Sequence, residues 1–383
     1  MRIVHMTSVH PWDDNRIFNK MCRFLASQGN DVHLVAAMSE RYDGKIIDGV
    51  TLHAVNTPVN RRERFLKTTP AVLEKAQLIN GDLYHFHDPE FLPYISKFRS
   101  KALKPVIYDV HEDYPAAILS KGWVPKLYRP ILSKIVNVLE KKMVTRVDGV
   151  ILAWPKIIDR FPKHSLKVLI NNYPYLKELQ PIENKAIKRE RGMFVYVGGL
   201  SPIRGVLEII KAIALGGGQY KLILGGNWES EAYKQKCQTE PGWTFCEYRG
   251  FLSRKDMRDV LATVQAGLIA FFPEPNHRYS VPNKIFEYIS AGLPVIASDL
   301  PMQRSIVEET GCGVVADARS PLSIFEKMQW IYNNADKAAE MGNAGRRAVE
   351  EKFNWESEAK KLKSFYEEIL NRKNITSVRL TIE

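Results

Sequence analysis

The sequence predicts an α/β protein of two domains, each built on a doubly wound parallel sheet. Two stretches of alternating strand and helix support this class, one starting at Arg2 and the other at Met193. Between them, Leu176–Arg191 is polar and contains a proline, which is typical of a domain boundary. A chain of 383 residues is long enough for two or three domains. We expect a first domain over 1–172, a second over 173–355, and a final helix and tail over 356–383.

The first domain opens with a strand–helix–strand unit. Arg2–Thr7 and Val32–Ala37 predict buried strands, and Ile17–Gln28 has apolar residues at helical spacing. Further strands are expected at Val50–Val55, at the start of Leu83–Leu92, at the start of Pro105–Pro115, at Val147–Ala153 and at Val168–Ile170. In the long helix Tyr128–Arg146, the residues expected to face inward are Leu132, Ile135, Val136 and Leu139, and those expected to face outward are Lys134, Lys141 and Lys142.

Polar side chains follow the strands of this first domain. Two of these strands end in the groups His85, His87, Asp88 and Glu90, and Asp109, His111, Glu112 and Asp113. Loops at the carboxyl ends of parallel strands line the ligand crevice of a doubly wound sheet, so we expect these groups to form one wall of a site. The loop His10–Arg16 is polar and lacks glycine, so a close approach of its backbone to a phosphate is not expected.

The second domain begins with a strand, a glycine turn and a helix. Strands are expected at Met193–Val197, Lys221–Leu224, Ala266–Phe272 and Val295–Ala297, and a helix at Val206–Ile213. A nicotinamide dinucleotide site would need the spacing G-x-G-x-x-G and an acidic residue at the end of the next strand. The glycines lie at 198, 199 and 205, and the next strand ends in Gly225-Gly226. Both requirements fail, which argues against NAD.

The stretch Ser280–Asp299 (SVPNKIFEYISAGLPVIASD) predicts a phosphate-binding helix end. Ser280 or Asn283 can cap a helix that Gly292 ends, and Pro282 suits its first turn. The free N–H groups of such a helix start bind anions. Glu287 lies one turn further along and can accept hydrogen bonds from a ribose diol, which together indicate a nucleotide-diphosphate site. The alternative is a buried helix–strand corner with a solvated Glu287.

This stretch resembles the donor-site motif of retaining GT-B glycosyltransferases of the family-4 type. That motif has two glutamates eight residues apart, followed by a small residue, Gly, Pro and Val. Glu287 and Ala291–Ile296 match its second half, whereas Tyr279 stands at the first glutamate. Arg204-Gly205 matches the Lys-Gly step of the family's phosphate turn, although Gly199 replaces its upstream arginine. HDPE (87–90) and YDVHEDYP (108–115) resemble the branch that makes bacterial surface polysaccharides.

The resemblance implies a fold and a reaction. The fold is GT-B: two Rossmann-like domains facing each other across a cleft, with the C-terminal helix crossing back to the first domain. Domain 1–172 would bind the acceptor and domain 173–355 the nucleotide sugar. The reaction is transfer from a nucleotide-diphospho-sugar to a saccharide or lipid-linked saccharide with retention of configuration, in surface-polysaccharide biosynthesis. A nucleotide-sugar epimerase, a phosphorylase and a catalytically degenerate binding homologue stay open as alternatives.

The resemblance also implies roles for individual residues. The expected catalytic residues are His111, Arg204 and Glu287. The expected donor-binding residues are Gly198, Gly199, Arg204, Gly226, Phe251, Ser280, Val281, Pro282, Asn283, Lys284 and Glu287, and the expected acceptor-binding residues are Asp14, Asn15, Arg16 and His87. Asp13 and Asp14 are adjacent rather than spaced as metal ligands, so we expect no metal and no cofactor.

Charge is the unusual bulk property of the chain, with a formal net charge of +12. Between Thr57 and Arg146 there are 16 Lys and Arg against 9 Asp and Glu, mixed with Phe65, Phe98, Trp123, Leu127 and Tyr128. General solubility is one interpretation. Peripheral contact with an anionic membrane is the other. Nucleic acid is not expected as a partner, because no binding module is recognisable.

The expected location follows from what the chain lacks. It has no signal-peptide pattern, no apolar run of about 18 residues, and four scattered cysteines that are expected to be reduced thiols. We therefore expect a cytoplasmic protein. The basic segment Thr57–Arg146 adds the inner face of the plasma membrane as an alternative location.

Overall fold

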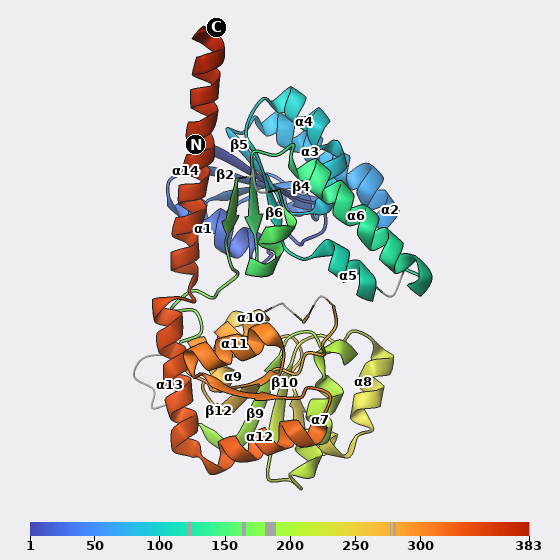
Figure 1. The fold of residues 1–383 in the computed structure, drawn as a ribbon, viewed down its shortest axis with the longest axis vertical. Helices are drawn as coiled ribbons and strands as arrows, with labels where there is room; N and C mark the ends of the chain where they lie inside the picture. Colours follow the sequence, from blue (N-terminus) through green and yellow to red (C-terminus); the bar gives the residue numbers. More distant parts are fainter. Residues whose placement is uncertain (122–123, 163–165, 181–188, 276, 279–280, 383) are drawn as a thin grey trace. The chain divides into compact units, whose positions relative to one another are not determined.

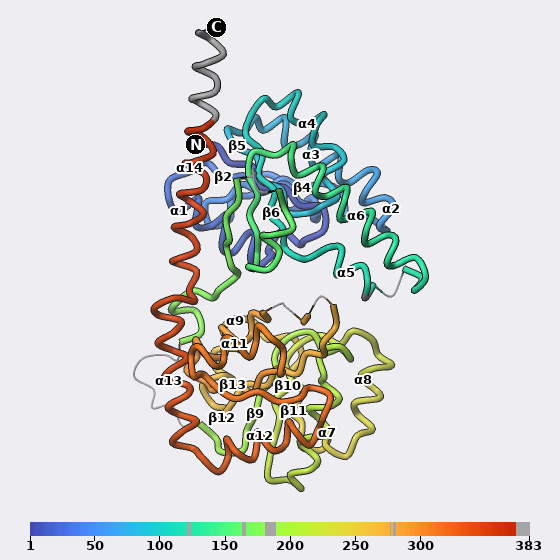
Figure 2. The backbone as a smooth tube through the Cα atoms, viewed as in Figure 1, coloured from blue at the N-terminus to red at the C-terminus, as the bar shows by residue number. Residues whose placement is uncertain are grey.

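The computed structural model describes residues 1–121, 124–162, 166–180, 189–275, 277–278 and 281–382 (Figure 2). The chain divides into two compact units: unit 1 comprises Met1–Asn172 and Ser357–Glu383, and unit 2 comprises Tyr173–Glu356. The last helix, α14 (Trp355–Ile382), therefore contributes most of its length to unit 1. The sequence predicts a helix followed by a tail over 356–383, but no Gly or Pro follows Arg372 to end the helix, which extends to Ile382.

Unit 1 contains an eight-stranded sheet in the order β3-β4-β2-β1-β5-β6-β7-β8. Every neighbouring pair is parallel except β3–β4. The strands are β1 (Arg2–Thr7), β2 (Asp31–Ala37), β3 (Ile46–Ile47), β4 (Val50–Val55), β5 (Leu83–Phe86), β6 (Val106–Val110), β7 (Gly149–Leu152) and β8 (Lys167–Leu169). The strand order reverses between β1 and β5, which is the position where doubly wound sheets bind ligands.

Helices cover both faces of the unit 1 sheet (Figure 1). On one face, Val4 and Met6 of β1 join a core with α3 (Thr69–Ile79) and α4 (Ile95–Ala102). On the other face lie the π-helical turn η1 (Ile17–Cys22), α1 (Arg23–Ser27) and α14, whose Tyr366 contacts His85 of β5 (Figure 2). The remaining helical segments are η2 (Glu40–Tyr42), α2 (Arg61–Glu63), η3 (Arg64–Thr68), η4 (Pro89–Tyr94), α5 (Tyr114–Ser120), η5 (Lys126–Tyr128), α6 (Arg129–Val144) and η6 (Pro155–Arg160).

Helix α6 does not bury the face that the sequence predicted. Ile135 and Leu139 are exposed, and Leu132 and Val136 are only half-buried. The helix is anchored by its C-terminal part instead, where Val144 is buried and the buried Glu140 pairs with Arg160 and accepts a hydrogen bond from Tyr108. Phe98, expected as a surface residue, is buried, whereas Phe65 is exposed. Trp123 lies outside the described residues.

Unit 2 contains a six-stranded parallel sheet in the order β11-β10-β9-β12-β13-β14. The strands are β9 (Glu190–Val197), β10 (Lys221–Gly225), β11 (Cys246–Tyr248), β12 (Val264–Leu268), β13 (Val295–Ser298) and β14 (Gly313–Ala316). Counted in chain order, this is the 3-2-1-4-5-6 arrangement of the Rossmann fold, with its switch point between β9 and β12. The strand expected at Ala266–Phe272 ends early, at Leu268.

Two helical layers sandwich this sheet. Tyr196 and Leu224 face a core with α7 (Val206–Leu215) and α12 (Pro321–Asn333), whereas Val195 and Ile223 face a core on the opposite side. The opposite layer consists of α9 (Arg254–Leu261), α10 (Asn283–Ser290), α11 (Pro301–Thr310) and α13 (Ala335–Glu351). The remaining segments are η7 (Pro202–Arg204), α8 (Glu231–Gln238) and η8 (Pro241–Phe245). The sheet is therefore covered on both faces, as all-parallel sheets require.

Candidate active site

Three turns at the carboxyl ends of neighbouring strands are joined in unit 2. The N–H of Gly198, directly after β9, donates to the carbonyl of Gly225 at 2.8 Å. The N–H of Gly226, directly after β10, donates to the carbonyl of Gly250 at 2.6 Å. Gly226 has a φ of +135°, and a Cβ there would lie 1.9 Å from the carbonyl oxygen of Gly198. Glycine is therefore required where these backbones meet.

Two cations lie against the first of these turns. A Cβ on Gly198 would come within 2.5 Å of the Lys284 Nζ, and a Cβ on Gly199 within 2.5 Å of the Arg204 Nη1. The two glycines thus leave room for two positive side chains beside the strand end. The Lys284 Nζ also donates to the Tyr196 hydroxyl at 3.0 Å.

The electrostatics of these cations favour an anionic ligand. Burial lowers the pKa of Lys284 well below its ordinary value, and the neighbouring charge of Arg204 lowers it further, whereas the more distant Glu287 acts in the opposite direction. Within the described part of the chain, neither Lys284 nor Arg204 forms an ion pair. Like charges that are held together without a carboxylate are stabilised by a bound anion.

Helix α10 adds its N-terminus to this region. Its N-cap is Pro282, in extended conformation, and no side chain caps it in the described residues. Asn283 is the first helical residue rather than the cap, because proline cannot donate and suits the flanking position. Val281 is half-buried, and Ser280 and Tyr279 lie outside the described residues. An uncapped helix start favours negative charge.

Glu287 lies one turn into α10 and is held by an arginine. Its Oε1 accepts a hydrogen bond from the Arg254 Nη1 at 2.6 Å, and the Arg254 Nε donates to the Glu178 Oε1 at 2.7 Å. Burial would lower the pKa of Arg254, but Glu287 and Glu178 outweigh it and raise that pKa. The sequence analysis missed Arg254. The available signal was the Ser253–Asp256 capping box that begins α9.

Phe251 follows the third turn and is 75% exposed, so its ring is accessible to a ligand. The predicted donor residues that the structure describes thus gather along the strand ends of unit 2 and the first turns of α10. Their predicted contacts with a donor stay predictions.

In unit 1, the polar wall predicted from the sequence is centred on a buried ion pair. The Arg16 Nε and Nη2 each donate to the carboxylate of Asp109 at 2.8 Å, and both side chains are buried. Burial would raise the pKa of Asp109, but Arg16 and His111 outweigh it and hold that pKa well below its usual range. The Arg16 Nη1 donates to the carbonyl of Ile170 at 2.8 Å. An acceptor contact by Arg16 would therefore compete with these bonds.

His87 and His111 meet the same carboxylate. The His87 Nδ1 lies 3.1 Å and the His111 Nε2 3.0 Å from the Asp109 Oδ2. The other ring nitrogen of His87 lies 3.0 Å from the His5 Nδ1, so both nitrogens of this predicted acceptor residue have partners within unit 1. His111 is partly exposed, as a ligand contact would require.

The loop after β1 is organised by Asp14. Its Oδ1 accepts from the N–H groups of Arg16 and Ile17 and so begins η1. Its Oδ2 lies 3.5 Å from the His10 Nδ1. Burial lowers the pKa of His10, but the carboxylates of Asp14 and Asp88 outweigh it and raise that pKa. Asp14 and Asn15 are half-buried, and their acceptor roles stay predictions.

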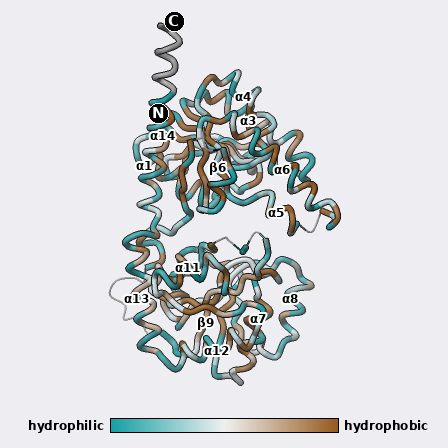
Figure 3. The backbone as a smooth tube through the Cα atoms, in the orientation of Figure 1, coloured by the Kyte–Doolittle hydropathy of each residue, from teal (hydrophilic) through white to brown (hydrophobic). Residues whose placement is uncertain are grey.

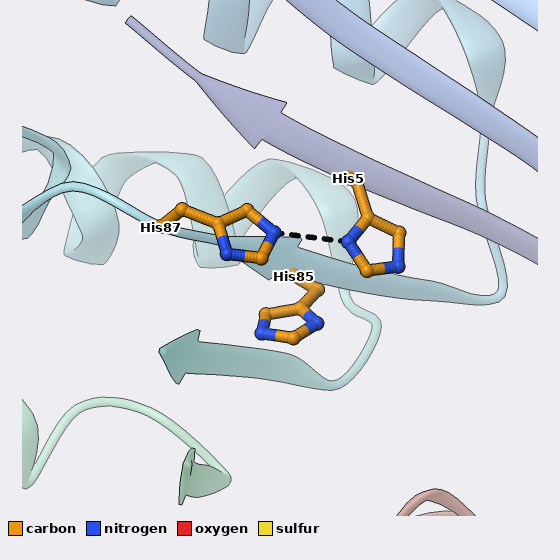
Figure 4. A group of neighbouring side chains, drawn as sticks. All are labelled: His5, His85 and His87. Atoms are coloured by element: carbon orange, nitrogen blue, oxygen red, sulfur yellow. Dashed lines mark hydrogen bonds between the residues drawn. The ribbon is translucent and has the colours of Figure 1, made fainter. Parts of the chain in front are cut away.

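Three buried histidines group on one face of the unit 1 sheet (Figure 4). His5 and His85 are register partners on β1 and β5, and His87 follows on the same face. Two groups have ligand atoms close enough for a metal ion, His5–His85–His87 and His87–Asp109–His111. The three rings of the first group pack together with centroids 4.4–5.2 Å apart, and the His5–His87 hydrogen bond already uses one nitrogen of each. The absence of a metal stays a prediction.

Comparison with known proteins agrees with the two-unit architecture. The family model described as "Glycosyltransferase Family 4" matches residues 15–163, and the model described as "Glycosyl transferases group 1" matches residues 180–348. The chain belongs to the GT-B glycosyltransferases of the family-4 type. The resemblance stated from the sequence is thereby confirmed, and this family-4 glycosyltransferase is an enzyme of sugar transfer.

Individual relatives are distant in sequence but cover the chain almost completely. The D-rhamnosyltransferase WbpZ of Pseudomonas aeruginosa is 20% identical over 359 residues, 89% of each chain. Sucrose-phosphate synthase of Thermosynechococcus elongatus has a TM-score of 0.77 at 17% identity, covering 97% of this chain and 99% of that one. Anabaena HepE, solved in complex with UDP-glucose, has a TM-score of 0.73 at 15% identity, covering 96% and 100%. These similarities confirm the GT-B fold.

Proposed function

We propose that this glycosyltransferase moves a sugar from a nucleotide-diphospho-sugar to a saccharide or lipid-linked saccharide, with retention of configuration, in surface-polysaccharide biosynthesis. The observation that carries the proposal is the pair Arg204 and Lys284, packed against Gly198 and Gly199 without a carboxylate partner among the described residues. The nucleotide sugar in the HepE complex and the sugar transfer named for WbpZ support it.

In the proposed mechanism, positive groups of the site stabilise the negative charge that develops on the leaving diphosphate. The bond between the anomeric carbon and the diphosphate oxygen breaks, and negative charge grows on the diphosphate. Arg204, Lys284 and the N-terminus of α10 would stabilise that charge. The acceptor oxygen attacks from the same side, and its proton passes to the departing phosphate oxygen, so configuration is retained. Glu287 would hold the ribose diol, and His111 would contact the donor sugar.

The nucleotide can be found by thermal unfolding with UDP, GDP, dTDP and CMP. Saturation at 100 times the Kd should stabilise the protein by about 2.7 kcal/mol. Stabilisation should fall in Arg204→Ala and Glu287→Ala and persist in Arg191→Ala, a matched loss of an exposed cation that stacks on Tyr332. No shift with any nucleotide, or equal shifts in all variants, would contradict the donor assignment.

Product analysis separates the remaining alternatives. With the identified donor, a glycosyltransferase forms a glycoside only when an acceptor is added. An epimerase converts the donor without an acceptor, a phosphorylase requires phosphate, and a degenerate homologue binds the nucleotide without turnover. Only the first outcome supports the proposal.

Exposed apolar side chains of helix α6 support membrane contact by unit 1. The α6 face, defined as Ile131, Ile135, Val138 and Leu139, is 43–62% exposed, and it continues into the exposed Leu127 and Tyr128. Residues 121–146 contain seven Lys and Arg and one acidic residue, Glu140, which is buried. In Figure 3 this region alternates between hydrophilic and hydrophobic colours. We propose that the α6 face binds an anionic bilayer, since apolar area and positive charge act together at such surfaces.

No helix in the described part of the chain has both the length and the apolar character to cross a membrane. Co-sedimentation with vesicles of phosphatidylglycerol and phosphatidylcholine at low salt tests surface binding. Binding should fall in Ile131→Asn/Val138→Asn and persist in Leu78→Asn, an exposed leucine near the end of α3. Loss of self-association in the double variant, with no vesicle binding by the natural chain, would overturn the proposal in favour of a second copy.

A further inference from the structure

A chain of buried side chains connects helix α14 to His111. The Tyr366 hydroxyl of α14 lies 2.6 Å from the His85 Nδ1 and 3.4 Å from the His5 Nε2. The His5 Nδ1 lies 3.0 Å from the His87 Nε2, and the His87 Nδ1 lies 3.1 Å from the Asp109 Oδ2. The chain ends where the His111 Nε2 meets the same oxygen at 3.0 Å.

The ionisation state of Asp109 determines where the hydrogens lie along this series of hydrogen-bonded side chains. Because Arg16 pairs with Asp109 through two bonds, the carboxylate is ionised and can only accept. The His87 Nδ1 and the His111 Nε2 lie 3.3 Å from each other, but each lies closer to the carboxylate oxygen, at 3.1 and 3.0 Å. We therefore assign hydrogen to both nitrogens, each donating to Asp109.

The assignment then continues inward, because burial lowers the pKa values of His87, His5 and His85 and keeps these rings neutral. The His87 Nε2 is an acceptor, so the His5 Nδ1–H donates to it. The His5 Nε2 is then an acceptor for the Tyr366 O–H, whose oxygen accepts from the His85 Nδ1–H. The remaining nitrogen, the His85 Nε2, has no partner in the described structure.

We propose that Asp109 is a positioning residue for His111, which it holds in the tautomer with hydrogen on Nε2 and a lone pair on Nδ1. The rings of His10 and His87 lie 4.7 and 5.4 Å from the His111 ring, and Asp14 interacts with it electrostatically. Behind these groups, Asp88 lies beside His10, and Arg16 pairs with Asp109. In this tautomer Nδ1, which has no hydrogen bond in the described structure, can accept one, and a substrate hydroxyl can donate it.

The hydrogen bond from a substrate hydroxyl rests on the proposed function, in which His111 contacts the donor sugar. The tautomer of His111 is independent of the proposed function. The test is nitrogen-15 NMR of the full chain with labelled histidine, in which long-range proton–nitrogen couplings report the tautomer of each ring. His111→Gln, His87→Gln and His5→Gln identify the signals. We expect hydrogen on Nε2 of His111 and on Nδ1 of His87 and His5. Hydrogen on Nδ1 of His111 would overturn the proposal.

Two variants separate positioning from folding. Tyr366→Phe should shift the His5 and His85 signals and leave the His111 tautomer unchanged, because the order is imposed from Asp109. Asp109→Asn should release the His111 tautomer and lower kcat/KM about ten-fold while nucleotide binding by unit 2 stays intact. If Asp109→Asn unfolds, Tyr366→Phe still decides, since a changed His111 tautomer there would contradict the proposed direction.

The matched control is His33→Gln, which removes a second histidine pair, the 2.9 Å contact between the His33 Nδ1 and the His53 Nε2. It should leave the His111 signals unchanged. Addition of ZnCl₂ tests the alternative that the three histidines bind a metal ion. Stoichiometric zinc that shifts the signals of His5, His85 and His87 would overturn the assignment, because a metal would occupy the lone pairs that the chain uses.

Discussion

The two polar centres of the molecule differ in how their charges are compensated. In unit 1, Asp109 and Arg16 neutralise each other, and the surrounding histidines donate toward that pair. In unit 2, Arg204 and Lys284 lie beside glycines without an ion pair in the described structure, and Glu287 acts on Lys284 only from a longer distance. An ion pair within the protein holds its side chains in place. Cations without an ion-pair partner are available to bind a ligand of opposite charge. The comparison predicts that mutations in unit 1 affect stability first and those in unit 2 affect binding first.

The largest effect is expected from Asp109→Asn. The substitution leaves the Arg16 guanidinium buried without a counter-charge, which should lower the free energy of unfolding by about 3–5 kcal/mol. Urea unfolding measures it. Asp299→Asn, which removes the surface partner of Arg304, should have little effect. Equal losses in both variants would contradict the contrast.

Acid should destabilise unit 1 through its neutral histidines. Burial, with the charge of His33, lowers the pKa of His53 to about 4, and burial lowers the pKa values of His5 and His85 as well. The unfolded chain therefore binds more protons below pH 6.5, and stability is lost as the pH falls from 6.5 toward 4. Thermal midpoints across this range measure the loss. His53→Gln should make the decline shallower, and an unchanged decline would exclude His53 as a contributor.

Gly199→Ala should weaken nucleotide binding without unfolding unit 2. Its Cβ would meet the Arg204 Nη1, the end of a flexible side chain that can move aside. Displacement of this cation should raise the Kd for the preferred nucleotide about ten-fold. In an Arg204→Ala background the same substitution should cost nothing more, and additive losses would show that the glycine acts elsewhere.

The smallest expected signal is proton uptake on nucleotide binding. Burial and the charge of Arg204 lower the pKa of Lys284, so its ammonium group holds its proton less firmly than an exposed lysine does. A diphosphate stabilises the ammonium and raises its pKa, so binding should take up a fraction of a proton. Calorimetry in buffers of different ionisation enthalpy measures it. Lys284→Met should abolish the uptake, and uptake that persists must come from another group.

The sequence predicted these strands well because buried parallel strands are nearly continuous apolar runs, as in residues 193–197 of β9 (MFVYV) and in Val295–Ser298. A motif predicted the glycine turns after the strands of unit 2 and the position of Glu287 one turn into a helix. The prediction failed for α6, because helical periodicity indicates an apolar face but not whether another element covers it.

Two tertiary contacts could not be predicted from the sequence. Arg254 reaches Glu287 from another helix, and His5 joins His87 from a strand 82 residues away. Local pattern contains no information on such contacts.

Helix α14 has a consequence for the order of synthesis. Unit 1 is assembled from both ends of the chain: Tyr366 closes the histidine face, and Phe365 and Ile369 pack beside Gly149 on β7. Unit 2 is contiguous and can fold while translation continues. On the ribosome, the amino-terminal sheet is made first, but the part of its face that α14 covers is completed only when the last segment emerges. The part of the enzyme that is translated first is therefore the part that is completed last.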